Sequence, residues 1–219
     1  MLTHRQRSFI ATLESVEGTL NFLDQLHGRP IVLGAPERTP EHSPKFEDIA
    51  LAGFGRRFRI ARRLGKLTRP APETAIPVGR NESHYLGHVP EHVDAAPLQL
   101  YFRSMENGYR LFVRSPVRYG KSFYIHAENC VCALDSPHEG SYASLFDLLD
   151  ENDAPIAYEA LEDDMTLRLG PAGKGTALML RTFAGLPYTY ICTQGQRPLE
   201  LRLKIQQRNA AYVSAPDEV

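Results

Sequence analysis

Residues 97–115 read PLQLYFRSMENGYRLFVRS, and this stretch predicts a β-hairpin. Leu98, Leu100 and Phe102 alternate with other side chains, which is the two-residue period of a strand that buries one face. Asn107-Gly108 follows, a dipeptide that tolerates the positive φ angles of a type I′ turn. Apolar residues then alternate again over the next six positions. We therefore expect two antiparallel strands joined at Asn107-Gly108.

Further strand candidates follow the hairpin at intervals of about ten residues, separated by turn-forming residues. The clearest is 199–205, where Leu199, Leu201, Leu203 and Ile205 face one way and charged residues face the other. Regular short strands of this kind indicate a sandwich, a barrel or a trefoil. The other candidates are 122–127, 129–134, 141–149, 156–158, 165–169, 178–182 and 188–192.

A faint internal repeat favours a β-trefoil over a β-sandwich. Residues 98–115 and 178–194 both run from an apolar strand through Arg-Ser or Arg-Thr and a small turn to a Tyr-led strand. Residues 144–161 fit as a third copy with an acidic turn, and the spacing suits three repeated units. Ricin-type lectins carry Gln-x-Trp in such repeats. This chain has no Trp, so the likeness extends to the fold alone.

The amino-terminal region, by contrast, predicts a helix from Thr3 to about Leu26. Thr3 and Gln6 have the spacing of a capping box, and His27-Gly28 is a typical helix end. We expect the apolar face of this helix to pack against the core. That face contains Phe9, Leu13, Val16, Leu20 and Leu23, which recur at helical spacing.

Two proline-rich connectors, with prolines 36, 40 and 44 and then 70, 72 and 77, interrupt the first half of the chain. We expect the main boundary between the halves near Ala95, or alternatively nearer Pro70. The sequence therefore predicts an α+β protein: a helical and basic region 1–95, an all-β module 96–213 that is trefoil-like or alternatively a sandwich, and a tail 214–219.

A basic run lies between the connectors. It contains seven cations among apolar residues with no acid between them, a pattern that suits nucleic acid, anionic lipid or an acidic protein. The alternative is pairing within the fold, for which the acidic stretch 147–164 supplies carboxylates. The cations are Arg56, Arg57, Arg59, Arg62, Arg63, Lys66 and Arg69.

Tyr and Arg residues crowd the first hairpin, and both types are common anchors at protein interfaces. If their side chains share an exposed face, that face suits a macromolecular partner; the alternative is that another segment covers it. The partner-binding candidates are Tyr101, Arg103, Arg110 and Arg114.

His84, His88 and His92 form the densest histidine group, at a spacing that would align three imidazoles on a helix for zinc. Gly87 and Pro90 interrupt such a helix, and HExxH is absent. We therefore expect a polar surface loop and no metal or other cofactor. Three cysteines without a CxxC pattern do not indicate a disulfide framework.

The composition of the 219 residues, 42% of them hydrophobic with a net charge of -1, fits a globular protein without a global affinity for polyanions. The chain has no signal-peptide pattern and no apolar run that spans a bilayer, so a cytoplasmic location is expected. Secretion without a cleaved signal leaves no such pattern and stays open.

The predicted function is that of a soluble, non-enzymatic protein that binds a macromolecule, most simply a protein, through the Tyr/Arg surface and the basic run. One alternative is a nucleic-acid-binding protein that uses Arg56–Arg69. The other is a small hydrolase or metal-dependent enzyme that uses His84, His88 and His92.

Overall fold

The computed structural model describes residues 2–34, 79–126, 128–135 and 144–212, and their regular structure is almost entirely β-strand. The one α-helix in these ranges is α1 (Leu23–His27), and Tyr158–Ala160 forms a 3-10 helix. Among the residues described, no helix is long and apolar enough to cross a membrane. The strands are β1 (Phe9–Ser15), β2 (Thr19–Phe22), β3 (Val32–Leu33), β4 (Arg80–Asn81), β5 (Leu86–Val89), β6 (Leu98–Met105), β7 (Gly108–Val113), β8 (Ser122–Ile125), β9 (Val131–Leu134), β10 (Phe146–Leu149), β11 (Asp164–Pro171), β12 (Met179–Thr182), β13 (Thr189–Cys192), β14 (Arg197–Pro198) and β15 (Leu201–Arg208).

The chain divides into two compact units, one of Met1–Ile31 with Asn81–Val219 and the other of Val32–Arg80. Within the second unit the structure describes residues 32–34 and 79–80, and β3 pairs with β4 as a two-stranded sheet. Every other strand belongs to the first unit. Strands from both sides of residue 95 therefore share one compact body.

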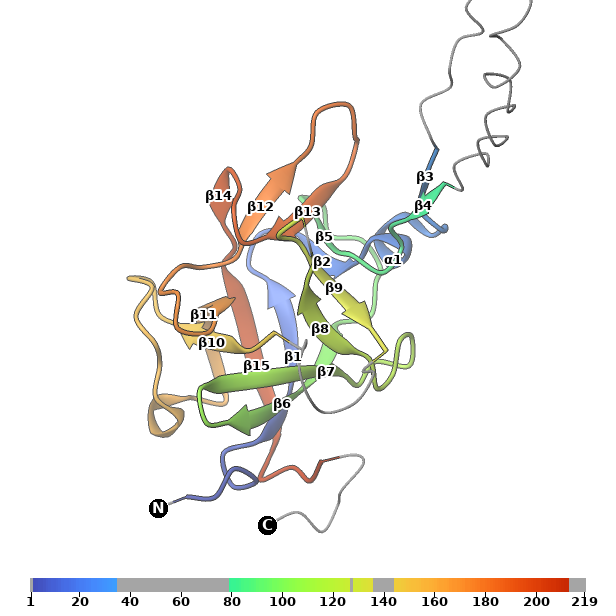
Figure 1. The fold of residues 1–219 in the computed structure, drawn as a ribbon. Helices are drawn as coiled ribbons and strands as arrows, with labels where there is room; N and C mark the ends of the chain where they lie inside the picture. Colours follow the sequence, from blue (N-terminus) through green and yellow to red (C-terminus); the bar gives the residue numbers. More distant parts are fainter. Residues whose placement is uncertain (1, 35–78, 127, 136–143, 213–219) are drawn as a thin grey trace, which may run out of the picture. The chain divides into compact units, whose positions relative to one another are not determined.

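Six antiparallel strands of the first unit close into a barrel (Figure 1). Around the ring their order is β10, β11, β15, β1, β6 and β7, and β7 returns to β10 where Tyr109 pairs with Phe146. Closure leaves few exposed strand edges. Inward-pointing side chains fill the barrel, and the Phe9 ring stacks on the Phe102 ring with 4.7 Å between centroids.

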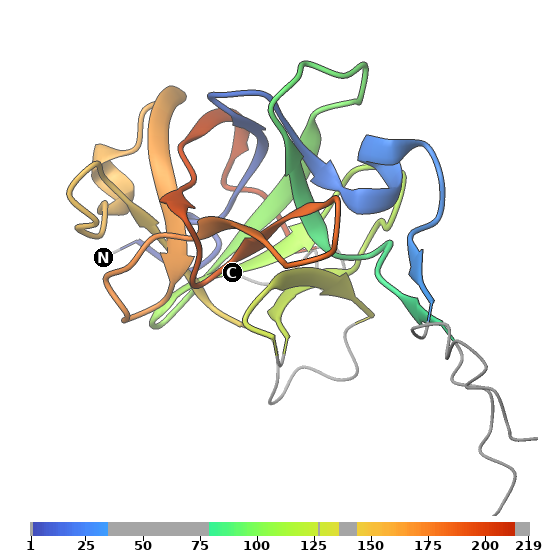
Figure 2. The same ribbon diagram turned by 90° about the horizontal axis from the view of Figure 1, so that it is seen from above.

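Three hairpins lie at one end of the barrel, formed by β2 with β5, β8 with β9, and β12 with β13 (Figure 2). The chain thus consists of three four-strand units, in each of which the first and last strands belong to the barrel and the two middle strands form a hairpin. The units are β1-β2-β5-β6, β7-β8-β9-β10 and β11-β12-β13-β15. Six barrel strands with three hairpins in this order form the strand plan of a β-trefoil. The hairpins contact one another pairwise, through the residue pairs His88–Thr189, Tyr85–Cys132 and Cys130–Cys192.

The predicted α+β class is wrong, because the amino-terminal residues form strands and a turn in place of a long helix. In β1, buried and half-buried residues alternate, and Phe9 and Leu13 point into the barrel. A spacing of four residues satisfies both a helix and a strand, so the apolar stripe did not distinguish them. The Thr3–Gln6 hydrogen bond of the expected capping box does form, at 2.9 Å, but it closes a turn.

Gly18 explains why the chain reverses between β1 and β2. Its φ is +96°, and a Cβ at this position would lie 2.1 Å from the carbonyl oxygen of Val89. Only glycine combines this backbone conformation with so close an approach to β5. Gly18, which lies inside the predicted helix, is therefore the point at which two strands separate.

The predicted hairpin at 98–113 is confirmed as β6 and β7, but its turn differs from the expected one. Met105 pairs with Gly108, so the two loop residues are Glu106 and Asn107, and neither has a positive φ. A type I′ turn at Asn107-Gly108 is therefore wrong. Gly108 has φ +121°, and a Cβ there would lie 2.8 Å from the Phe146 carbonyl oxygen, where β7 meets β10 to close the barrel.

Two of the three cysteines form a disulfide, contrary to the expectation from their odd number. Cys130 is bonded to Cys192, which joins the second hairpin to the third, and both residues are buried. Cys132 is a buried free thiol. The pairing was invisible in the sequence because the two partners lie 62 residues apart and meet only through the three-fold arrangement of hairpins.

Candidate functional site

The basic run lies outside the described residues. Its position in the strand order is nonetheless clear, since it falls between β3 and β4 in the connection from β2 to β5. The corresponding connections from β8 to β9 and from β12 to β13 are only a few residues long. The run is thus an insertion in the first hairpin. Arg56, Arg57, Arg59, Arg62, Arg63 and Lys66 stay predicted binding residues.

The Tyr/Arg candidates of the first hairpin come together on the outer surface of the barrel. In the β6–β7 register, Arg103 lies directly opposite Arg110, and Tyr101 lies opposite Phe112. Like charges at directly opposed positions of a sheet are unfavourable. We call these four residues, together with Tyr212 that covers them, the β6–β7 outer face.

Tyr212 is the residue of this face that sequence reasoning missed. Its ring lies 5.3 Å from the Phe112 ring and 6.1 Å from the Tyr101 ring, and the Arg103 guanidinium carbon lies 3.9 Å from its centre. Tyr101 is buried and donates a hydrogen bond to the carbonyl oxygen of Ala210 at 3.2 Å. The chain after β15 therefore covers the aromatic part of the face, and Arg103 lies at the edge of the covered area.

Arg110 is the anomalous residue of this face. Arg110 is 9% exposed, and no described residue forms an ion pair with it. In particular, its buried Nε–H has no acceptor. A buried cation is unfavourable unless it is paired.

Arg114, the fourth candidate, lies apart in the loop between β7 and β8. It donates a hydrogen bond to the Tyr119 hydroxyl at 2.9 Å, and Tyr119 is 52% exposed. Arg118, with φ +65°, turns back into the protein and binds the Asp24 carboxylate and the Ser83 carbonyl oxygen. The loop is therefore anchored while Arg114 and Tyr119 face outward together.

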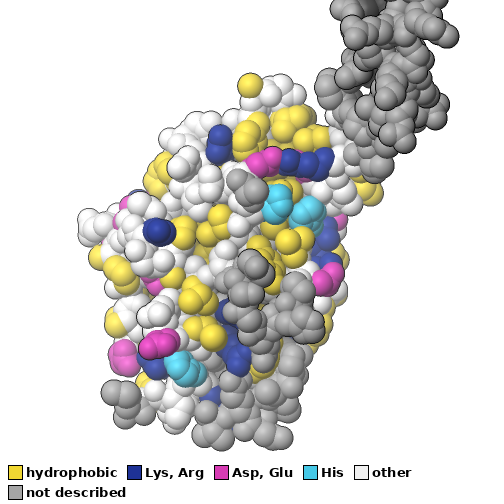
Figure 3. All heavy atoms as spheres, in the orientation of Figure 1, with side chains coloured by type: hydrophobic (Ala, Val, Ile, Leu, Met, Phe, Trp, Pro, Cys, Tyr) yellow, Lys and Arg dark blue, Asp and Glu magenta, His cyan; other side chains and the backbone are white. Residues whose placement is uncertain are grey.

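The acidic stretch 147–164 is paired with arginines of the same barrel. Asp164 accepts two hydrogen bonds of 2.7 Å from Arg202, and Arg168 contacts both Asp153 and Glu200 at 3.2 Å. Figure 3 shows the same mixture, with most visible acidic side chains next to a cation. These pairs account for several carboxylates that we had considered as partners of the basic run.

The three candidate metal ligands do not converge. Of the three, only His88 lies in β5, whereas His84 lies in the turn before this strand and His92 lies beyond its end. His84 is half-buried beside the Tyr85 ring, and burial with the Arg118 charge lowers the pKa of its imidazole. His92 is exposed. No group of three metal-ligating side chains occurs within the described ranges.

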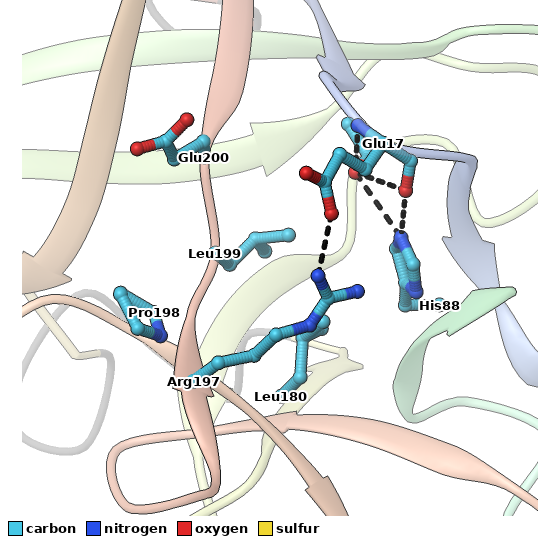
Figure 4. A pocket seen from close by; sticks show the side chains of 8 residues that line it. Glu17, His88, Leu180, Arg197, Pro198, Leu199 and Glu200 are labelled. Atoms are coloured by element: carbon cyan, nitrogen blue, oxygen red, sulfur yellow. Dashed lines mark hydrogen bonds and ion pairs between the residues drawn. The ribbon is translucent and has the colours of Figure 1, made fainter. Parts of the chain in front are cut away.

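His88 lines a pocket of about 260 Å³ between the barrel and the first and third hairpins (Figure 4). Arg197 and Glu17 form an ion pair across its mouth, and buried Leu180 and Leu199 form part of its wall. Sequence reasoning missed the pocket because its residues come from four distant segments. The full lining is Ser15, Glu17, His88, Leu180, Arg197, Pro198, Leu199 and Glu200.

The serine and histidine of this pocket are engaged in structural hydrogen bonds. Ser15 Oγ donates to the carbonyl oxygen of Glu17 at 3.1 Å, and His88 Nε2 donates to the same oxygen. A catalytic pair needs an unprotonated histidine nitrogen that accepts the serine proton. Here both groups donate to one carbonyl, so they fix the β1–β2 turn.

No protein-family model matches this chain, and no curated protein or solved structure matches it either.

Proposed function

We propose that this chain is a non-enzymatic binding protein that engages another protein through the β6–β7 outer face, with the basic run 56–69 as a second contact. The observation that carries the proposal is Arg110, a buried guanidinium that faces Arg103 and has no acidic partner among the residues that the structure describes. An arginine that is left unpaired in the free protein becomes favourable when a partner supplies a carboxylate.

The composition of the face supports a protein partner over nucleic acid. Tyr101 and Phe112 lie buried beneath Tyr212, so a partner would contact the edge of this aromatic cluster, where Arg103 and Arg110 provide the directed donors common at protein interfaces. Binding to a nucleic-acid backbone depends on several cations that each neutralise a phosphate. Two cations among aromatic rings suit one or two carboxylates of a protein surface better.

Two candidate nucleophiles have environments that disfavour catalysis, which supports binding as the function. Burial raises the pKa of the Cys132 thiol to about 12, so the reactive thiolate does not form at neutral pH. Ser15 is oriented toward a backbone carbonyl. Neither side chain has the activated state that nucleophilic catalysis needs.

We also propose that the protein works in an oxidising compartment, although the lack of a signal-peptide pattern led us to expect the cytoplasm. The support is the Cys130–Cys192 disulfide, since such bonds persist mainly outside the reducing cytosol. Mass spectrometry of alkylated, unreduced protein isolated from its source tests this. Alkylation of Cys130 and Cys192 in addition to Cys132 would contradict the proposal.

The test of the binding function is affinity capture from a lysate of the source cells with the full chain as bait. A face variant, Arg103→Gln with Arg110→Gln, is compared with a matched control, Lys174→Gln with Arg181→Gln, which removes the same charge elsewhere. A third bait changes Arg57, Arg59, Arg62 and Arg63 to Gln. All are first shown to be folded at the temperature of the capture.

We expect the wild type and the matched control to capture the same protein, and the face variant to lose it. Nuclease treatment should leave the capture unchanged. Equal capture by the face variant would contradict the role of the face, and loss on nuclease treatment would favour nucleic acid. If only the third bait fails to capture the protein, the basic run is the binding site and the β6–β7 outer face is not.

A further inference from the structure

The pocket beside His88 presents two fixed, opposite charges above an apolar wall. Glu17 lies on the β1–β2 turn and Arg197 on β14, and their side chains are 71% and 50% exposed. Leu180 and Leu199 beneath them are 5% and 3% exposed. In Figure 4 the Glu17 carboxylate and the Arg197 guanidinium face each other at the mouth, while the Glu200 carboxylate points away.

The backbone segments that carry the two charges are held in place by the surrounding structure. The backbone of Glu17 is fixed by His88 Nε2 and Ser15 Oγ, which donate to its carbonyl oxygen, and by its own N–H, which donates to Ser15 Oγ at 3.3 Å. Arg197 pairs with Leu180 in the β12–β14 register. A site whose groups are already positioned loses less entropy on binding.

Arg197 retains donors for a further partner. A guanidinium has five N–H groups, and the bond that Arg197 forms in the structure uses one of them, toward Glu17. Glu200, the other acid of the lining, is bound by Arg168 at 3.2 Å. The charges that face the pocket are therefore one cation and one anion, so a ligand with both charges is complementary to the pair.

We propose that this pocket binds a free α-amino acid with an aliphatic side chain. The ligand carboxylate would bind Arg197, its ammonium group would bind Glu17, and its side chain would contact Leu180, Pro198 and Leu199. A volume of about 260 Å³ lies just below the range of drug-sized sites and fits a ligand of this size. This site is separate from the β6–β7 outer face and does not depend on the binding function proposed for that face.

Isothermal titration of the full chain with three matched probes tests the charges one at a time. L-leucine carries both charges, L-leucinamide lacks the carboxylate, and 4-methylpentanoate lacks the ammonium group. We expect leucine to bind and each of the other probes to bind at least about tenfold more weakly, the scale of one charge-assisted hydrogen bond. Titrations extend to about 10 mM, because a ligand this small has a limited affinity.

Variants assign the binding to the pocket. Arg197→Gln and Glu17→Gln should each weaken leucine binding about tenfold, whereas Arg181→Gln, on the adjacent strand β12 and outside the pocket, should leave it unchanged. Absence of leucine binding by the wild type would overturn the proposal. Equal binding of leucinamide, or equal leucine binding by an Arg197→Gln protein with unchanged thermal unfolding, would overturn it as well.

Discussion

Cys130 and Cys192 are bonded across two hairpins that belong to different four-strand units of the trefoil, and the bond closes a loop of 62 residues. Constraining a loop of this length in the unfolded chain stabilises the native state by about 4 kcal/mol in the chain-entropy model. The bond thus joins the second and third units where the hairpins meet.

Replacing both cysteines in Cys130→Ala with Cys192→Ala should therefore lower the free energy of unfolding by about 4 kcal/mol. Urea denaturation with the free energy extrapolated to water measures the loss. As a control, a reductant should destabilise the wild type and leave the double variant unaffected. A double variant as stable as the oxidised wild type would contradict the role of the disulfide.

Arg110→Met should raise stability, by about 1 kcal/mol, because it removes a buried cation that pairs with no described carboxylate and keeps the apolar length of the side chain. The same change should abolish capture of the partner. A residue that is unfavourable in the free protein and needed for its function is the pattern expected of a binding site.

Arg168→Met is the matched comparison for that prediction. Arg168 pairs with Asp153 and Glu200, so its loss leaves two carboxylates without their cation and should lower stability. Thermal unfolding of the two variants should move in opposite directions from the wild type. A fall in both would indicate that Arg110 contributes to stability as an ordinary packed residue.

Local patterns in the sequence predicted individual strands but not their arrangement. Leu199, Leu201 and Leu203 were predicted to share a buried face and do, because alternation is a property of one strand. Residues 98–115 and 178–194 appeared to be copies, yet the first is the β6–β7 hairpin and the second is β12–β13. They occupy different places in the three-fold plan. In addition, the 44-residue stretch 35–78 separates β2 from β5, so the strands of the first four-strand unit do not recur at the interval seen in the other two.

The candidate sites were predictable only in part, for the same physical reason. Arg103 and Arg110 could be named because one hairpin brings them together. Tyr212, which covers them, is more than a hundred positions away in the sequence and has no local pattern that marks it. The ion pair of Glu17 and Arg197 spans an even longer separation. Such neighbours depend on barrel closure, which no short stretch encodes.

Gly18→Ala should destabilise the protein severely, by at least about 3 kcal/mol, because it adds a clash to an unfavourable backbone conformation. The new Cβ would lie 2.1 Å from the Val89 carbonyl oxygen. Gly185→Ala is the control, since its φ is +80° and no atom lies within 4 Å of the added Cβ. It should cost about 1 kcal/mol. Equal losses in the two variants would show that the contact with β5 contributes nothing.

Stability should fall as the pH is lowered through about 6.5, and His88 should be one of the causes. Burial lowers the pKa of His88 below its ordinary value of 6.5, an effect that the Arg197 charge reinforces and the Glu17 carbonyl and carboxylate partly oppose. Just below pH 6.5 the unfolded chain therefore binds more protons than the folded one, which favours unfolding. Well above pH 6.5 the imidazole is neutral in both states, and this contribution is constant.

The measurement is the free energy of unfolding in urea at several pH values for the wild type and for His88→Gln, which keeps a side-chain N–H donor. The variant should have a smaller slope below pH 6.5 than the wild type. Part of the slope should persist, because burial also lowers the pKa of His84 and of His27. A slope that His88→Gln leaves unchanged would mean that His88 titrates as freely in the folded protein as in the unfolded chain.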